Sequence, residues 1–173
     1  GLYGNFMNSN GLGLWTDALN PAPGAPPPSG APLLTGVTPN QGVNDIDTQV
    51  TISGATLDNS AGGQLSGNQL NLTSRDTLTN RGGLIEANQG LTVGGGNLDN
   101  SAGGQLRALK GITSSINVSG AVNNQNGILE FGSQGFSLDA ASLNNQSGQL
   151  QHAGSGLMRV HTASLTGSQG NIN

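Results

Sequence analysis

The sequence predicts an all-β chain folded as a right-handed parallel β-helix, a solenoid of about six coils with a period near 21 residues. The stretch Leu57–Leu65 (LDNSAGGQL) recurs letter for letter at Leu98–Leu106, and four degenerate copies accompany these two. Each copy follows a short pair of apolar residues that alternates with polar ones, the pattern of a half-buried strand. Repetition at a nearly fixed interval is typical of solenoids, in which neighbouring coils bury one another.

The composition supports this class and argues against others. The chain has 173 residues, of which 30 are glycine, and only 8% are charged. Helical repeats need longer units rich in helix formers. With five basic residues and a net charge of −4 we expect no nucleic-acid partner. The absence of cysteine excludes disulfides and thiolate metal sites. No apolar run is long enough for a membrane-spanning helix, and the start of the chain lacks the pattern of a signal peptide.

The first 48 residues differ from the rest. Residues 1–20 carry three of the five aromatic side chains, Tyr3, Phe6 and Trp15, so this segment is either a cap on the open end of the solenoid or a contact site for a partner. Residues 21–32 hold six of the seven prolines, which predicts an extended linker. Residues 33–48 are interpreted as a degenerate first coil.

Residues 49–173 contain the clear repeats, each marked by an anchor glycine in the unit Gly-x-[Leu/Ile]. The anchor glycines are Gly63, Gly83, Gly104, Gly127, Gly148 and Gly170, at intervals of 20, 21, 23, 21 and 22 residues. Because a turn needs left-handed backbone or close approach to a neighbouring chain, we expect these glycines to supply one or the other. The surplus residues of the fourth repeat are predicted to form a bulged loop around Gly111–Ser115.

Alternation predicts which side chains face the lumen. The alternating pairs are Val50/Ile52, Leu70/Leu72, Leu91/Val93, Ile116/Val118, Phe136/Leu138 and Met158/Val160. Two aliphatic columns should accompany them, namely Leu57, Leu78, Leu98, Val122, Leu143 and Leu165, and Leu65, Ile85, Leu106, Leu129, Leu150 and Ile172.

Asparagine occupies one turn position in five consecutive repeats. These residues are Asn59, Asn80, Asn100, Asn124 and Asn145, and the sixth repeat has Gly167 there. Amide side chains stacked on successive rungs can hydrogen-bond to one another, so we expect a structural ladder that ends before the sixth coil. On the surface, Glu86, Arg107 and Glu130 should stack as an ion-pair ladder, each pair contributing about 0.2–1 kcal/mol. His152 falls at an inward position near the open end.

The sequence offers no convincing catalytic, metal or cofactor site. Asp58 and Asp99 fall two rungs apart, roughly 9.6 Å, with Thr79 between them, and no third group supports this carboxylate pair. His152 and His161 have no carboxylate or cysteine partner close in the sequence. The outward positions carry too few threonines for an ice-binding array. We therefore expect no enzyme, no cofactor and no metal.

The repeats Leu-Asp-Asn-Ser-Ala-Gly-Gly-Gln-Leu, Leu-Thr-Asn-Arg-Gly-Gly-Leu-Ile and Leu-Asn-Asn-Gln-Ser-Gly-Gln-Leu resemble those of bacterial filamentous haemagglutinins and of the related exoproteins of contact-dependent growth inhibition. The resemblance covers about residues 49–173 and carries over no catalytic residue. It implies a piece of a virulence-associated filament, exported by two-partner secretion through an outer-membrane transporter to the cell surface. There it would act as an adhesin or toxin-presenting stalk that meets a host-cell or bacterial receptor.

Two other predictions stay open. The alternative function is a glycan-binding or glycan-cleaving β-helix, such as a fragment of a phage tailspike. Because rungs at the ends of a solenoid present unpaired strand edges, end-to-end self-association is also expected.

Overall fold

A computed structural model describes residues 5–7, 13–15 and 49–173 of the chain. These residues form β-strands and connecting turns without any helix, and hence without a helix that could cross a membrane. All strand pairs are parallel, and equivalent strands of successive coils are stacked about 21 residues apart. The prediction of an all-β parallel solenoid of about six coils is therefore confirmed.

The described strands belong to two sheets. The first sheet contains β1 (Asn5–Met7), β3 (Gln49–Asp58), β5 (Gln69–Thr79), β7 (Leu91–Asp99), β9 (Thr113–Val118), β10 (Ala121–Asn123), β12 (Gly135–Asn144) and β14 (Met158–Thr166). The second contains β2 (Gly13–Trp15), β4 (Gln64–Gly67), β6 (Leu84–Ala87), β8 (Gln105–Ala108), β11 (Ile128–Phe131), β13 (Gln149–His152) and β15 (Asn171–Ile172).

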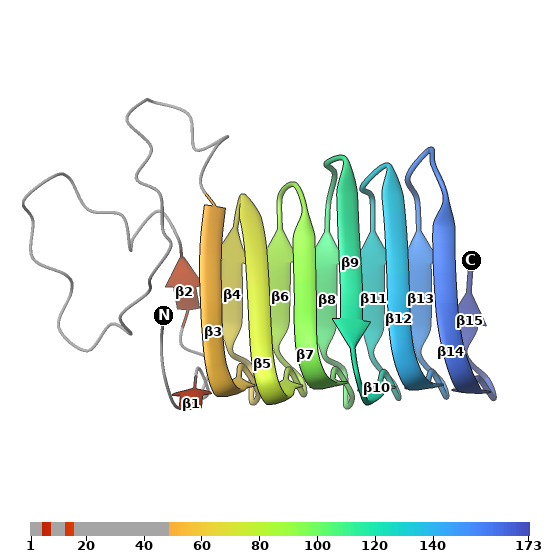
Figure 1. Cartoon of the computed structure of the whole chain (residues 1–173), viewed down its shortest axis with the longest axis horizontal. Helices are drawn as coiled ribbons and strands as arrows, with labels where there is room; N and C mark the ends of the chain where they lie inside the picture. Colours follow the sequence, from red (N-terminus) through yellow and green to blue (C-terminus); the bar gives the residue numbers. More distant parts are fainter. Residues whose placement is uncertain (1–4, 8–12, 16–48) are drawn as a thin grey trace, which may run out of the picture.

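Each repeat coil consists of a long strand in the first sheet, a tight turn, a short strand in the second sheet and a loop that leads to the next coil; in the fourth coil the long strand is divided into β9 and β10. In Figure 1 the long strands descend at the front, the short strands rise at the back, and the chain advances from left to right. This sense of winding is right-handed, as the sequence predicts.

The two aliphatic columns form as the repeats predict. Leu57 is paired with Leu78, and Leu78 with Leu98, and the same register continues through the last coil. The second column is stacked in the other sheet, from Leu65 to Ile172. Except for Leu165 and Ile172 in the last coil, these side chains face one another across the lumen and belong to a single apolar core.

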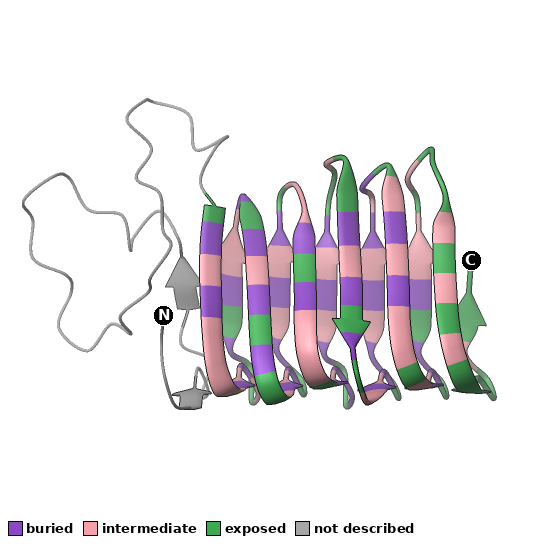
Figure 2. Ribbon diagram, viewed as in Figure 1, coloured by how far each residue is buried: buried purple, intermediate pink, exposed green. Residues whose placement is uncertain are grey.

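Burial follows the strands in bands, with inward residues alternating with half-buried and exposed ones (Figure 2). The last coil departs from this pattern. Leu165 is 53% exposed and Ile172 is 37% exposed, whereas Leu143 and Leu150 one coil earlier are buried. The described residues place no further rung over β14 and β15, which accounts for the exposure of Leu165 and Ile172.

Phe131 and Phe136 lie in the lumen of the fourth and fifth coils. The rings of Phe131 and Phe136 are stacked with centroids 3.8 Å apart, and both side chains are buried. His152 follows Phe131 in the same column and is only half-buried, which agrees with its predicted place near the open end.

The fourth coil corrects two sequence predictions. Ile116 and Val118 are both buried, as expected, but Ile116 is paired with Val93 and Leu138. The pair in register with Phe136/Leu138 is therefore Ser114/Ile116 and not Ile116/Val118. Ser114 is buried, and its hydroxyl accepts a hydrogen bond from the Leu91 backbone N–H at 3.1 Å. The surplus residues are also differently placed, because residues 113–115 belong to β9 and the loop covers 109–112.

Strands β1 and β2 place part of the N-terminal segment on the first coil. Asn5–Met7 are paired with Thr56–Asp58, and Gly13–Trp15 with Gln64–Ser66. Paired residues differ by 51 positions in both sheets, so residues 5–15 cover the same length of chain as one turn of a repeat. The linker predicted over 21–32 lies outside the described residues, and the coil predicted over 33–48 lies outside them too.

Candidate functional site

The asparagine column is the most regular polar feature of the lumen. The Nδ2 atom of each asparagine donates to the Oδ1 atom of the next, at 2.8 Å for Asn59 to Asn80, Asn80 to Asn100 and Asn100 to Asn124, and at 2.7 Å for Asn124 to Asn145. All five side chains are buried. We call this column the inner ladder, and it runs in one direction along the solenoid.

Backbone carbonyls occupy the remaining donor capacity of the inner ladder. Besides its ladder bond, the amide of Asn100 donates to the carbonyl of Gly104 at 3.1 Å and to that of Ile128 at 2.9 Å. A buried amide without partners would cost about 1–3 kcal/mol. With these bonds made, Asn100 has no donor left for a ligand, and its role is to fix the turns of two successive coils.

The anchor glycines lie where successive coils come closest. An added Cβ atom would stand 1.9–2.2 Å from an asparagine carbonyl oxygen of the preceding coil at Gly83, Gly104, Gly127, Gly148 and Gly170. These glycines do not have positive φ; close approach, the second of the two expected reasons, accounts for them. Gly63 is likewise buried, and its N–H donates to the Ser60 carbonyl at 3.1 Å.

The left-handed backbone of the turn lies one residue earlier. Gly82, Asn126, Ser147 and Gln169 have φ values of 64°, 56°, 53° and 57°. Their N–H groups are held in the stack, since Gly82 donates to the next coil's Ser101 and Asn126 to Gln146. The turn therefore accepts several residue types at an exposed left-handed position, next to a position that accepts only glycine.

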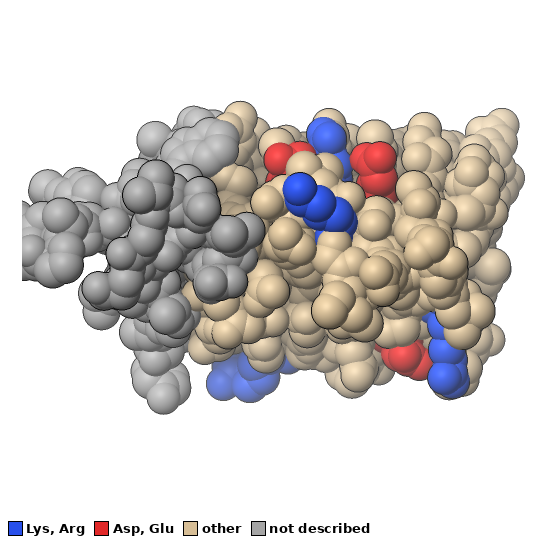
Figure 3. Space-filling model, turned by 90° about the horizontal axis from the view of Figure 1, so that it is seen from above, with Lys and Arg blue, Asp and Glu red and all other residues tan. Residues whose placement is uncertain are grey.

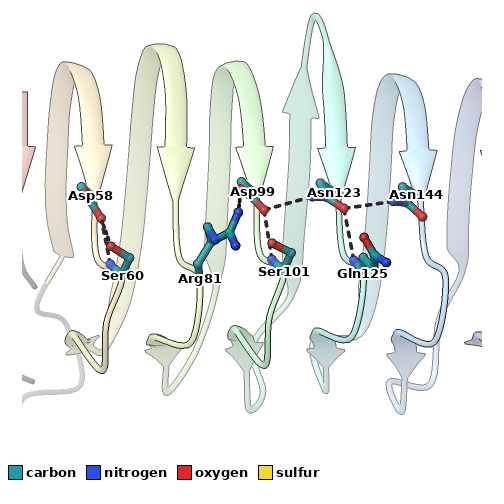
Figure 4. Close-up of polar contacts among 8 residues, drawn as sticks. All are labelled: Asp58, Ser60, Arg81, Asp99, Ser101, Asn123, Gln125 and Asn144. Atoms are coloured by element: carbon teal, nitrogen blue, oxygen red, sulfur yellow. Dashed lines mark hydrogen bonds and ion pairs between the residues drawn. The ribbon is translucent and has the colours of Figure 1, made fainter.

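An outer column of polar side chains accompanies the inner ladder (Figure 4). The Asp58 carboxylate accepts bonds from the backbone N–H and hydroxyl of Ser60, at 2.9 and 2.5 Å. Asp99 accepts from the Ser101 N–H at 3.2 Å. Both carboxylates thus stabilise the start of a turn, and Thr79 separates them in the register.

The outer column runs in the direction opposite to the inner ladder. Asn144 donates to Asn123, and Asn123 donates to the Asp99 carboxylate, both at 3.2 Å. Arg81 lies on the other side of Asp99, with the two charged groups 3.7 Å apart. A carboxylate that receives amide bonds and a guanidinium is suited to binding neighbouring coils together, and its two neighbours in the described column, Thr79 and Asn123, are not acids.

Charged side chains of the second sheet stack in the predicted register, but only one of the two expected ion pairs forms. Arg107 is flanked by Glu86 and Glu130 on the adjacent rungs, and its guanidinium lies 3.7 Å from the Glu86 carboxylate. Among the described residues no ion pair joins it to Glu130; the Nη2 atom of Arg107 donates to the Gln105 side-chain oxygen instead. The predicted three-residue ladder is in this respect wrong.

Acidic and basic side chains lie next to one another on the face seen in Figure 3 and form no separate basic patch there. On the exposed part of β5, the Asp76 carboxylate accepts a bond from Arg75 and raises the pKa of the Arg75 guanidinium. Both side chains are largely solvated, so this pair adds little to stability.

No family model, curated protein or solved structure matches the chain. We therefore infer its function from the fold, from the side-chain contacts and from the repeats of the sequence.

The histidines differ from what the sequence suggested. His161 does have a carboxylate partner, because its Nδ1 atom lies 3.0 Å from Asp139 on the adjacent strand. The expectation of no such partner is wrong for this residue, since parallel stacking joins positions 22 apart. His152 Nε2 lies 2.9 Å from the Ser133 carbonyl oxygen. The described residues contain no cluster of three or more side chains suited to a metal ion.

The three aromatic candidates for partner contacts belong to the N-terminal segment. Tyr3 lies outside the described residues. Phe6 and Trp15 belong to β1 and β2, which are described by their backbone pairing to Leu57 and Ser66. Their pairing with the first coil in the register of the repeats is a feature that the sequence interpretation missed. A signal for it exists, because the run Phe-Met-Asn-Ser from Phe6 matches the run Leu-Asp-Asn-Ser from Leu57.

Proposed function

We propose that this chain is a structural and adhesive segment of a secreted bacterial surface filament, without catalytic activity. A β-solenoid is compatible with a structural or adhesive repeat protein. One observation carries the proposal: the side chains that repeat from coil to coil are engaged in stacking those coils. The inner ladder bonds to itself and to backbone carbonyls, and the aspartates of the outer column cap turns.

The chain's shape suits a spacer. Six rungs at a spacing of about 4.8 Å make a rod roughly 29 Å long, whose length would grow with every added repeat. The residue type varies between coils on the outward faces. Thr92 and Ser137, for example, occupy equivalent outward positions two coils apart. Specific contacts with a receptor would therefore be made by outward columns, while the interior keeps the rod straight.

The likeness of the repeats to filamentous haemagglutinins supports export through an outer-membrane transporter of a two-partner system. In this proposal the segment stands on the cell surface, as an adhesin or as the stalk of a toxin of contact-dependent growth inhibition. Its receptor is a component of a host cell or of another bacterium. The gene should then encode a much longer chain with a secretion domain ahead of these repeats, and a gene without one would contradict this part.

Attachment of the purified chain tests the adhesive role. Beads coated with all 173 residues should attach to host cells or to bacteria more than beads coated with an unrelated protein of similar charge. Thr92→Glu together with Ser137→Glu places charge on the outer face of the first sheet. The matched control, Ser66→Glu with Gln151→Glu, does so on the second sheet.

If one face carries the contact, one of these two variants should lose attachment while both keep the circular dichroism of the parent chain. If the parent chain and both variants attach no better than the unrelated protein, the adhesive role is overturned and a passive stalk remains. The same preparations, incubated with a panel of bacterial polysaccharides, should release no oligosaccharide. Release of sugar would favour the alternative, a tailspike-like glycan-cleaving β-helix.

A further inference from the structure

The turn of the fourth coil contains a dipeptide with chemistry of its own. Asn126 precedes the anchor glycine Gly127, its side chain is exposed, and its φ is 56°. The same position holds Gly82, Ser147 and Gln169 in the other turns of this length, so Asn126 is the only asparagine at this left-handed position among the described turns. Asparagine tolerates the left-handed region, which is sufficient reason for its presence there.

An asparagine followed by glycine can modify itself without an enzyme. The backbone nitrogen of Gly127 attacks Cγ of Asn126, an N–C bond forms, and the Nδ2 atom leaves as ammonia. The nitrogen loses its proton to solvent, and the product is a five-membered succinimide. Water then adds to one of the two ring carbonyls and opens the ring to aspartate or isoaspartate. Glycine favours the first step because no side chain hinders its nitrogen.

The folded turn prevents the reacting atoms from forming the succinimide ring. The Gly127 N–H donates to the Asn124 carbonyl at 3.0 Å, and the Asn126 N–H donates to Gln146 of the next coil at 3.1 Å. On its other side Gly127 lies against the Asn100 carbonyl oxygen, which would be 2.1 Å from an added Cβ. Ring closure requires the peptide between the two residues to rotate, and this rotation would break the turn and separate it from both neighbouring coils.

We propose that Asn126–Gly127 is a latent self-modification site, which deamidates when the turn of the fourth coil opens and then prevents the coil from closing again. Isoaspartate moves one side-chain carbon into the backbone and so lengthens a turn whose glycine has no free space. The aspartate product keeps the backbone length and is tolerated at this exposed position. Opening of the turn is therefore reversible before deamidation and permanent in those molecules that form isoaspartate.

Deamidation rates in the full chain test the first half of the proposal. The chain is kept in mildly alkaline buffer, with and without a denaturing concentration of urea, and peptide mass spectrometry follows the conversion of Asn126. Because only the open turn reacts, conversion should be at least about tenfold slower in buffer than in urea. Equal rates in the two conditions would overturn the proposal, whatever the chain's ability to refold.

A variant tests the second half. Asn126→Ala removes the reacting amide, and Ala61 and Ala102 already adopt φ of 53° and 54° in the equivalent turns. After a long hold in alkaline urea and dilution, the parent chain should lose native circular dichroism in step with isoaspartate formation, while Asn126→Ala recovers it. Because the variant keeps the other Asn–Gly pair, Asn10–Gly11, any effect of deamidation there should appear in both chains. Equal loss in both chains would show that modification at Asn126 does not block refolding.

Discussion

Replacing the anchor glycine of the third coil by alanine should destabilise the solenoid strongly. In Gly104→Ala the new Cβ would lie 2.2 Å from the carbonyl oxygen of Asn80 and 2.8 Å from that of Asn100. Carbon and oxygen without a bond between them need about 3.3 Å, so the second and third coils would have to separate locally by about 1 Å.

Three hydrogen bonds cross the place where that gap would open. Gln105 N–H donates to the Gly83 carbonyl at 2.8 Å, and the Asn80 amide donates to Asn100 Oδ1 at 2.8 Å and to the Gln105 carbonyl at 2.9 Å. At about 1–1.5 kcal/mol for each bond, their loss lowers the free energy of unfolding by roughly 3–4.5 kcal/mol.

The matched control is Gly167→Ala. This glycine has no atom within 4 Å of an added Cβ and no positive φ, so alanine should leave stability unchanged or raise it by about 0.4–1 kcal/mol through the unfolded chain. Urea denaturation followed by circular dichroism measures both variants against the parent. If Gly104→Ala costs no more than Gly167→Ala, close approach is not the reason for the anchor glycines.

The remaining predictions concern single polar groups. Asn100→Asp puts an oxygen where the amide now faces three acceptors, and the free energy of unfolding should fall by about 3–5 kcal/mol; a loss below about 1 kcal/mol in urea denaturation would contradict this. Ser114→Ala leaves the Leu91 N–H without its acceptor, which should cost about 1–3 kcal/mol and speed hydrogen exchange at Leu91; unchanged exchange would show that the hydroxyl is dispensable. Glu86→Gln should cost about 0.2–1 kcal/mol at low salt and Glu130→Gln nothing measurable, so equal effects would mean that the ion pair alternates between the two.

The columns were predictable because the repeats themselves align them. Once Leu57 and Leu78 occupy the same place in two repeats, parallel stacking leaves little choice of register. The register of the fourth coil could not be predicted in this way. A shift of two residues in a strand keeps every side chain on its own face, so Ile116/Val118 and Ser114/Ile116 satisfy the alternation equally well. Only the length of the preceding loop, which the sequence pattern does not specify, decides between them.

Other differences have similar causes. Residues 5–15 do not show up in a search for a 21-residue period, because 33 residues lie between Trp15 and Gln49. The partner of His161 is Asp139, 22 residues away, and a search for nearby carboxylates in the sequence does not find it. The column that contains Arg107 was predicted correctly, but the rotamer of the arginine determines which of the two neighbouring carboxylates its guanidinium contacts. Rotamers depend on local packing that no repeat pattern encodes.

The uniform spacing of the coils has a consequence for how the chain assembles. Since nearly all contacts between coils join positions 20 to 24 residues apart, each new coil closes a loop of about the same length, at about the same entropic cost. A coil that has formed gives the next one a strand edge and a ladder acceptor or donor. Assembly can therefore proceed like a zipper, from whichever coil forms first, and a chain that becomes available gradually from one end could fold as it emerges.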